Sequence, residues 1–216
     1  MVRNILSIYY MNFIYIPKIC IISILNKEYF MSRVNNSYYA ILGILSAGPM
    51  SGYQIKTWVD EGVGYFWDID YKQIYPTLKK LVDSGLATFE VIKSGGRPES
   101  KVYQLTDLGI KALRDWLIKP IREGKQSTPE LMLKLFFGHH IPIEVNIEHL
   151  ERFKASTIAA IQKLEEISEC LKGETEKDAF WHYRMTTVNK GKLLRKSEMD
   201  WCSQTMEYLR TNIELQ

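Results

Sequence analysis

The sequence predicts a mainly α-helical protein with one small β-hairpin. Apolar residues recur at helical spacing through most of the chain. Only two short segments, 86–93 and 100–105, have the alternating, β-branched pattern that is typical of strands. Hydrophobic residues make up 46% of the 216 residues and charged residues 25%, so the chain can bury a core and is not expected to be disordered.

Residues 1–34 differ from the rest of the chain. The run from Ile5 to Leu25 carries a single charge, Lys18, and its length is about that needed to cross a hydrocarbon core. No small-residue cleavage site follows it, and the pattern of a folded domain begins close to Met31. We expect residues 1–34 to be an apolar leader that is either an over-long start or unstructured. A membrane anchor is the alternative.

A first domain is expected over residues 35–119, and it begins with three short helices. Ser51 can cap the second helix, and Gly85 can end the third as a C-terminal glycine. Pro76 lies inside the third helix, which must therefore begin later than expected or bend. The expected ranges are residues 37–45, Ser51 to Glu61, and Asp68 or Asp70 to Ser84.

The two predicted strands follow directly and form a hairpin. Its turn, residues 94–98, contains two glycines and a proline. Thr106 can cap a further helix that ends before Pro120. Three helices, a hairpin and a helix predict a winged helix-turn-helix domain.

The third helix has the composition of a DNA-recognition helix. Ile74, Leu78 and Leu81 share one face, which should pack inward. The outer face is cationic and polar, and lysines neutralise phosphates while glutamine can pair with adenine. The hairpin adds three basic residues. The predicted DNA contacts are Tyr71, Lys72, Gln73, Tyr75, Thr77, Lys79, Lys80, Lys93, Arg97 and Lys101.

Charge alone does not show whether the domain binds DNA. The net charge is +3, and residues 31–105 contain eight basic and seven acidic residues, so the field of this domain is local rather than broad. Lysines on one face of a helix can also be an ordinary solvated surface. The alternative is a membrane-tethered or protein-binding winged-helix module that recognises no operator.

Three motifs, in order, carry a family resemblance. They are SYYAILGILSAGPMSGYQI, QIYPTLKKLVDSGL and GGRPESKVYQLTDLG. Together they resemble the winged-helix domain of the PadR family of bacterial transcriptional regulators, over residues 37–117. The resemblance implies a dimeric DNA-binding regulator, usually a repressor, that a small molecule or another signal releases. It also implies that residues 71–84 form the recognition helix and residues 93–101 the wing.

Residues 128–216 are expected to form an all-helical dimerisation domain. Thr128, Pro129 and Glu130 have the pattern of a helix start. Long helices are expected from Pro142 to Leu171 and from Lys177 to Ile213, and their apolar stripes can pair helices within the chain or between two chains. Two copies would read a pseudo-palindromic operator. The second helix carries its stripe at Trp181, Met185, Val188, Met199, Cys202, Met206, Leu209 and Ile213.

Candidate effector contacts are aromatic. Trp116, Trp181 and Trp201 could line a cavity for a small molecule, although aromatic residues on helices are usually plain core. The four histidines lack the spacing of a metal site, and we find no pattern of a catalytic site or cofactor. Three widely separated cysteines favour a reducing compartment, so we expect a cytoplasmic protein that is not an enzyme.

Overall fold

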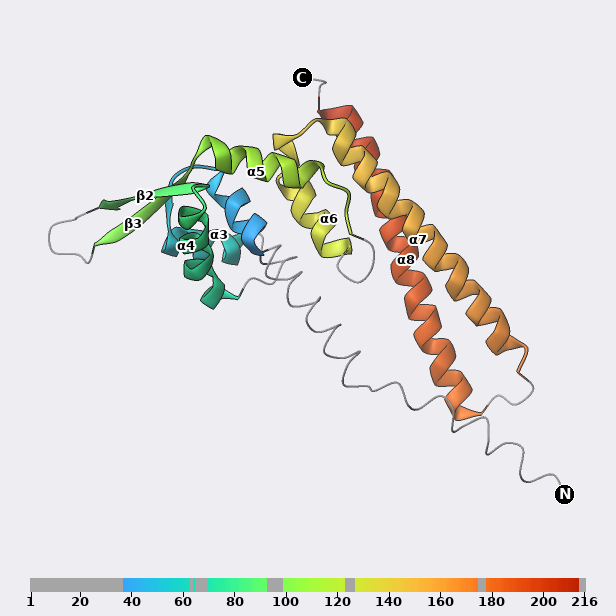
Figure 1. The fold of residues 1–216 in the computed structure, drawn as a ribbon. Helices are drawn as coiled ribbons and strands as arrows, with labels where there is room; N and C mark the ends of the chain where they lie inside the picture. The colour runs from blue at the N-terminus through green and yellow to red at the C-terminus, as the bar shows by residue number, and fades with distance from the viewer. Residues whose placement is uncertain are drawn as a thin grey trace, which may run out of the picture.

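The computed structural model describes residues 37–62, 64, 70–92, 99–122, 127–174 and 178–213. A winged helix-turn-helix part is followed by a helical part, so the predicted fold class is confirmed (Figure 1). The expected leader, and with it the question of a membrane anchor, lies outside the described residues. Within the described ranges, no helix has the length and apolar character needed to span a membrane.

The winged part has one strand more than expected. After a helix over residues 37–45 come β1 (Met50–Ser51), α3 (Gly52–Glu61), η2 (Tyr71–Gln73), α4 (Ile74–Asp83), β2 (Ala87–Ile92), β3 (Ser100–Leu105) and α5 (Asp107–Ile118). The sheet is antiparallel with the order β1-β3-β2, and Met50 pairs with Tyr103. β1 spans two residues, too few for alternation in the sequence to show, so it was not predicted.

The third helix begins later than predicted, and this removes the difficulty at Pro76. Asp70 caps a 3₁₀ turn rather than the α-helix, since its carboxylate accepts from the Lys72 amide. α4 itself starts at Ile74. Pro76 therefore lies in the first helical turn, where backbone N–H groups need no partner within the helix and proline costs little.

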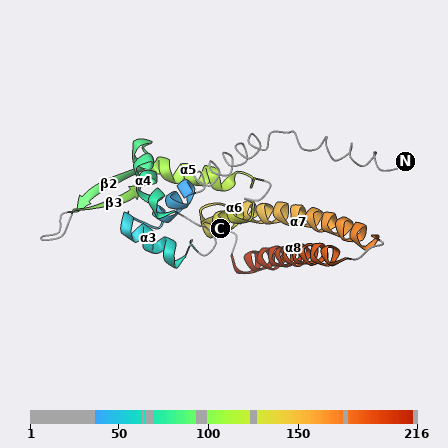
Figure 2. The same ribbon diagram turned by 90° about the horizontal axis from the view of Figure 1, so that it is seen from below.

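The helical part consists of α6 (Ser127–Phe136), η3 (Gly138–His140), α7 (Ile143–Lys172) and α8 (Ala179–Asn212). α7 and α8 run side by side as a long antiparallel hairpin (Figures 1 and 2). Val188, Cys202 and Met206 of the predicted apolar stripe are buried within the chain. That part of the stripe packs intramolecularly, which was the alternative reading of the pattern.

α6 contributes to two hydrophobic cores. Leu133 faces the core of the winged helix, together with Phe137 and Ile141 just after the helix. Leu131 belongs to the second core, formed with α7 and α8 by Leu150, Phe153, Cys202 and Met206. The winged-helix core therefore extends into the segment after α6. Because α6 packs in both cores, a movement of α7 and α8 would be transmitted through α6 to the winged part.

Candidate nucleic-acid interface

The start of α3 and the end of α4 are fixed by local hydrogen bonds. The Ser51 hydroxyl accepts from the Gln54 amide at 3.3 Å, and the Ser51 amide donates to Gln54 Oε1 at 2.8 Å, which makes a capping box. Gly85 has φ +70°, the left-handed conformation that ends a helix with little strain only at glycine. These two points hold the helix-turn-helix in place from both ends.

α4 presents a polar surface. Ile74, Leu78 and Leu81 are buried in the winged-helix core. Tyr75, Lys79 and Lys80 are exposed, as are Tyr71 and Lys72 in the preceding 3₁₀ turn, whereas Gln73 is half-buried. The structure thus brings these six predicted contacts to two consecutive elements, η2 and α4.

Thr77 does not belong to this surface. Only 6% of Thr77 is exposed, so the prediction that it contacts DNA is wrong. Thr77 follows Ile74 by three positions and directly precedes Leu78, which places it on the inward face of the helix.

Tyr71 is anchored to α3. Its hydroxyl donates a hydrogen bond to the Asp60 carboxylate, and the Lys56 ammonium lies 4.8 Å from the centre of the Tyr71 ring. The phenol oxygen can still accept a hydrogen bond, but its proton is engaged. Lys56 is an exposed cation beside η2 that the sequence analysis did not predict.

Tyr53 and Tyr75 add exposed phenols near the same surface. Tyr53 is 74% exposed and Tyr75 62% exposed, unusual values for large aromatic side chains. The Tyr75 ring lies over Gly52, the first residue of α3. Tyr53 directly follows Gly52 in α3, so both phenols lie at the start of that helix.

The charges of this surface are only partly neutralised within the chain. Lys79 Nζ lies 2.6 Å from the Asp83 carboxylate, and both side chains are more than half exposed. Such a pair is worth at most about 1 kcal/mol in water, so Lys79 can exchange its partner for a phosphate.

The wing is described only in part. Lys101 on β3 is exposed, and its ammonium lies 4.4 Å from the centre of the Phe89 ring on β2. Lys93 and Arg97, which were predicted to contact DNA, lie outside the described residues.

The three candidate effector tryptophans lie at three different places. Trp116 is buried and stacks on Tyr39 with ring centres 4.6 Å apart. The Trp181 ring N–H donates to the Leu171 carbonyl at 2.6 Å, at the end of α7. Trp201 alone lines the pocket described next, so the three do not share that cavity.

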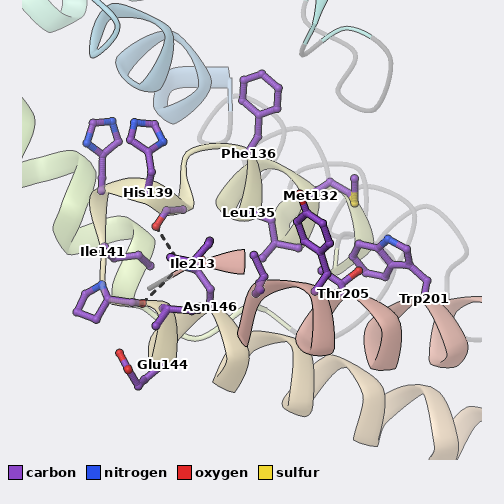
Figure 3. Close-up of a pocket in the computed structure, with 16 residues that line it drawn as sticks. Met132, Leu135, Phe136, His139, Ile141, Glu144, Asn146, Trp201, Thr205 and Ile213 are labelled. Atoms are coloured by element: carbon purple, nitrogen blue, oxygen red, sulfur yellow. Dashed lines mark hydrogen bonds between the residues drawn. The ribbon is translucent and has the colours of Figure 1, made fainter. Parts of the chain in front are cut away.

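This pocket of about 800 Å³ lies between η3, the start of α7 and the end of α8 (Figure 3). Its walls are largely apolar and aromatic, including Phe136, Trp201 and Tyr208. The Asn146 amide donates to the Gly138 carbonyl at 3.0 Å. The Asn146 carbonyl oxygen is buried and accepts no hydrogen bond from the described part of the chain.

The remaining candidate reactive groups, a cysteine and possible metal ligands, show no reactive arrangement among the described residues. Burial raises the pKa of the Cys202 thiol to about 11, so it stays protonated and unreactive near neutral pH. Among the described residues, no three His, Cys, Asp or Glu side chains are grouped to hold a metal ion.

Two family models match the chain. Residues 41–115 match the transcriptional regulator PadR-like family, and residues 129–210 match the C-terminal part of virulence activator alpha. The negative transcriptional regulator PadR of Bacillus subtilis is 48% identical over 101 residues. That alignment covers 46% of this chain, which thus spans about half (54%) of the relative's length.

Solved structures extend the comparison. The crystal structure of Bacillus subtilis PadR in complex with operator DNA matches with 31% identity over 79% of this chain and 96% of that chain, at a TM-score of 0.40. The complex of the same protein with p-coumaric acid matches with 32% identity over 80% and 94%, at a TM-score of 0.36. The resemblance found in the three motifs is confirmed, and the chain belongs to the PadR-like family of transcriptional regulators.

Proposed function

We propose that the chain is a sequence-specific DNA-binding regulator that acts as a homodimeric repressor in the cytoplasm and has no catalytic role. The observation that carries this proposal is the exposed surface of η2 and α4, with Lys72, Tyr75, Lys79 and Lys80 on one side of a helix whose other side is buried. Such a helix fits the major groove, where lysines bind phosphates and polar side chains reach base edges.

The wing and α3 support the same proposal. Lys101 lies on the hairpin, and Lys56 and Tyr53 lie on α3, so cations flank the recognition helix on both of its neighbouring elements. Phosphate contacts from flanking elements fix the register of a protein on the duplex, while the recognition helix reads the bases. A repressor is proposed because the Bacillus subtilis relative is a negative regulator.

Dimerisation would use the outer face of the α7–α8 hairpin. Large apolar side chains are exposed there although the two helices already share a core. Exposed apolar surface of this kind is typical of a protein–protein interface. The exposed residues are Ile158, Ile167, Phe180, Tyr183, Leu193 and Leu194.

The pocket beside Trp201 is the proposed effector site. A solved relative holds p-coumaric acid, a phenolic acid. The buried Asn146 oxygen can accept a hydrogen bond from a phenolic hydroxyl, and the apolar walls suit an aromatic ring. An effector releases DNA only if it binds one arrangement of the dimer better than the other.

Selection of binding sites from random duplexes by the purified chain tests the proposal. We expect a pseudo-palindromic sequence whose half-sites are about 10 base pairs apart or a multiple of that distance. The selected duplex should then shift in a titration with the protein, and a phenolic acid should reverse the shift. Recovery of no preferred sequence at low salt would exclude operator recognition.

A further inference from the structure

The end of α5 is the place where the winged part is tied to the helical part. α5 is the last helix of the winged part, and α6 lies between it and the α7–α8 hairpin (Figure 1). The last carbonyl groups of any helix have no partner within that helix and carry its partial negative charge. At the end of α5, side chains from the helical part satisfy these carbonyls.

Lys134 of α6 makes most of these contacts. Its ammonium donates to the carbonyl of Trp116 at 2.7 Å, to that of Leu117 at 3.3 Å, and to that of Lys119. It also lies 4.7 Å from the centre of the Trp116 ring. The side chain is 0% exposed, so an ammonium with three N–H donors is enclosed with three carbonyl acceptors.

A second buried side chain reaches the same point from α7. His149 is 2% exposed, and its Nε2 lies 2.8 Å from the Leu117 carbonyl oxygen. Because a carbonyl can only accept, Nε2 carries the proton and donates. One carbonyl of α5 is therefore held by both α6 and α7.

The charged groups around Lys134 come from three segments. Glu130 lies one turn earlier on α6, is 3% exposed, and pairs with Arg122 Nε at 3.1 Å. Burial lowers the pKa of Lys134 to about 8; Glu130 opposes this shift, and Arg122 and Lys119 add to it. Burial also lowers the pKa of His149, and the nearby Lys134 ammonium adds to that shift.

We propose that Lys134 is a positioning residue for operator recognition: its buried side chain, hydrogen-bonded to the carbonyls at the end of α5, fixes the angle between the winged part and the α7–α8 hairpin. The part that concerns the operator rests on the proposed function. In a dimer held together by α7 and α8, this angle sets the separation of the two recognition helices.

The chemistry of the side chain explains the positioning. Methionine has no N–H donor, so Lys134→Met removes the lysine donor from the carbonyls of Trp116 and Lys119. The attraction between the positive charge and the helix end, and that between the charge and the Trp116 ring, are also lost.

The buried charge also makes stability depend on pH. In the unfolded chain a lysine keeps its proton up to its ordinary pKa of 10.5, whereas in the folded chain it loses the proton at about pH 8. Between these values the unfolded state binds more protons, so the contribution of Lys134 to stability rises with pH.

Distances between spin labels within one chain test this without DNA. Glu90 on β2 and Glu165 on α7 are exposed and can be replaced by labelled cysteines after Cys20→Ser and Cys170→Ser; Cys202 is buried. Dilution with unlabelled protein restricts the signal to pairs within a chain. We expect a narrow distance distribution in the unsubstituted protein and a broad one in Lys134→Met.

Lys196→Met, at an exposed position of α8, is the matched control and should behave like the unsubstituted protein. A Lys134→Met distribution as narrow as that of the control would overturn the proposal, and thermal unfolding of the variant shows separately whether it is folded.

The operator gives the second test. With Lys134→Met, we expect affinity for the full pseudo-palindrome to fall about tenfold, the size of a typical coupling between sites, while affinity for an isolated half-site stays the same. An equal loss on both duplexes would show that Lys134 only supports the fold of the winged part, and it would overturn the positioning role. If the unsubstituted protein bound neither duplex, the proposed function would fail while the label distances would still test the angle.

Discussion

The ring of Tyr75 lies directly against the backbone of Gly52. A Cβ atom added at Gly52 would be 2.6 Å from Cε1 of that ring, closer than nonbonded carbon atoms approach. Gly52 is the first residue of α3, and Tyr75 is on the exposed surface of α4. The absence of a side chain at Gly52 therefore determines where the Tyr75 ring lies on the proposed DNA-binding surface.

Gly52→Ala should weaken operator binding more than it affects stability. The Tyr75 ring is 62% exposed and can turn away from an added methyl group at little cost, so we expect the free energy of unfolding to change by less than about 1 kcal/mol. The displaced ring no longer sits where it can meet the groove. Chemical denaturation and a fluorescence titration with operator DNA measure the two effects.

A double-mutant cycle provides the control. In a Tyr75→Ala background, Gly52→Ala should cause no further loss of affinity, because the ring that it displaces is absent. Additive losses would show that Gly52 acts on DNA binding independently of Tyr75.

Gly43→Ala presents the same kind of clash with the opposite outcome. A Cβ atom at Gly43 would collide with the Phe137 ring, which is 3% exposed and belongs to the winged-helix core. The ring has no free space to move into, so overpacking should destabilise the protein by about 1–3 kcal/mol. Thermal unfolding measures this loss, and an unchanged midpoint would contradict the packing at this position.

The local features of the fold could be predicted because they depend on neighbouring residues. Ser51, Gly85 and Thr106 cap or end helices through contacts within a few positions, and all three do so as expected. β1 could not be predicted, since a strand of two residues exists only because Tyr103 is there to pair with Met50. The double role of α6 in two cores likewise depends on long-range packing that no local pattern encodes.

The proposed DNA-binding surface was predicted in outline and corrected in detail. Helical periodicity placed Ile74 and Leu78 inward correctly, and strict use of the same period would have placed Thr77 beside them. Lys56 and Tyr53 were missed because they lie on another helix. The contacts of Lys134 require α6 to meet the end of α5, so a lysine within an apolar run gave no sign of them in the sequence.

Lys80→Ala should reduce the salt dependence of operator binding. Lys80 is exposed on α4, and loss of one phosphate contact lowers the slope of log affinity against log salt concentration by about one. Titrations at several salt concentrations give this slope. Lys163→Ala, on the exposed surface of α7, should leave it unchanged, and an unchanged slope with Lys80→Ala would remove Lys80 from the contacts.

Gln73→Ala should change which sequence is preferred rather than how tightly all DNA is bound. Gln73 lies at the boundary between the 3₁₀ turn and α4 and is half-buried, so the outer edge of its amide can reach a base. A bidentate contact with adenine is worth about 1–3 kcal/mol of discrimination. Site selection with the variant should lose the preference at one position in each half-site. An identical selected sequence would assign base reading to other residues.

The pH dependence of stability isolates the buried charge of Lys134. Removing the ammonium with Lys134→Met should cancel its contribution, so the difference in unfolding free energy between the unsubstituted protein and the variant should change with pH. Because the pKa of Lys134 is lowered to about 8 from 10.5, that difference should move in favour of the unsubstituted protein, by about 1–3 kcal/mol, as the pH rises from 8 to 10.5. Urea unfolding at fixed ionic strength measures it, and a difference that stays constant over this range would mean that Lys134 keeps its proton in the folded protein.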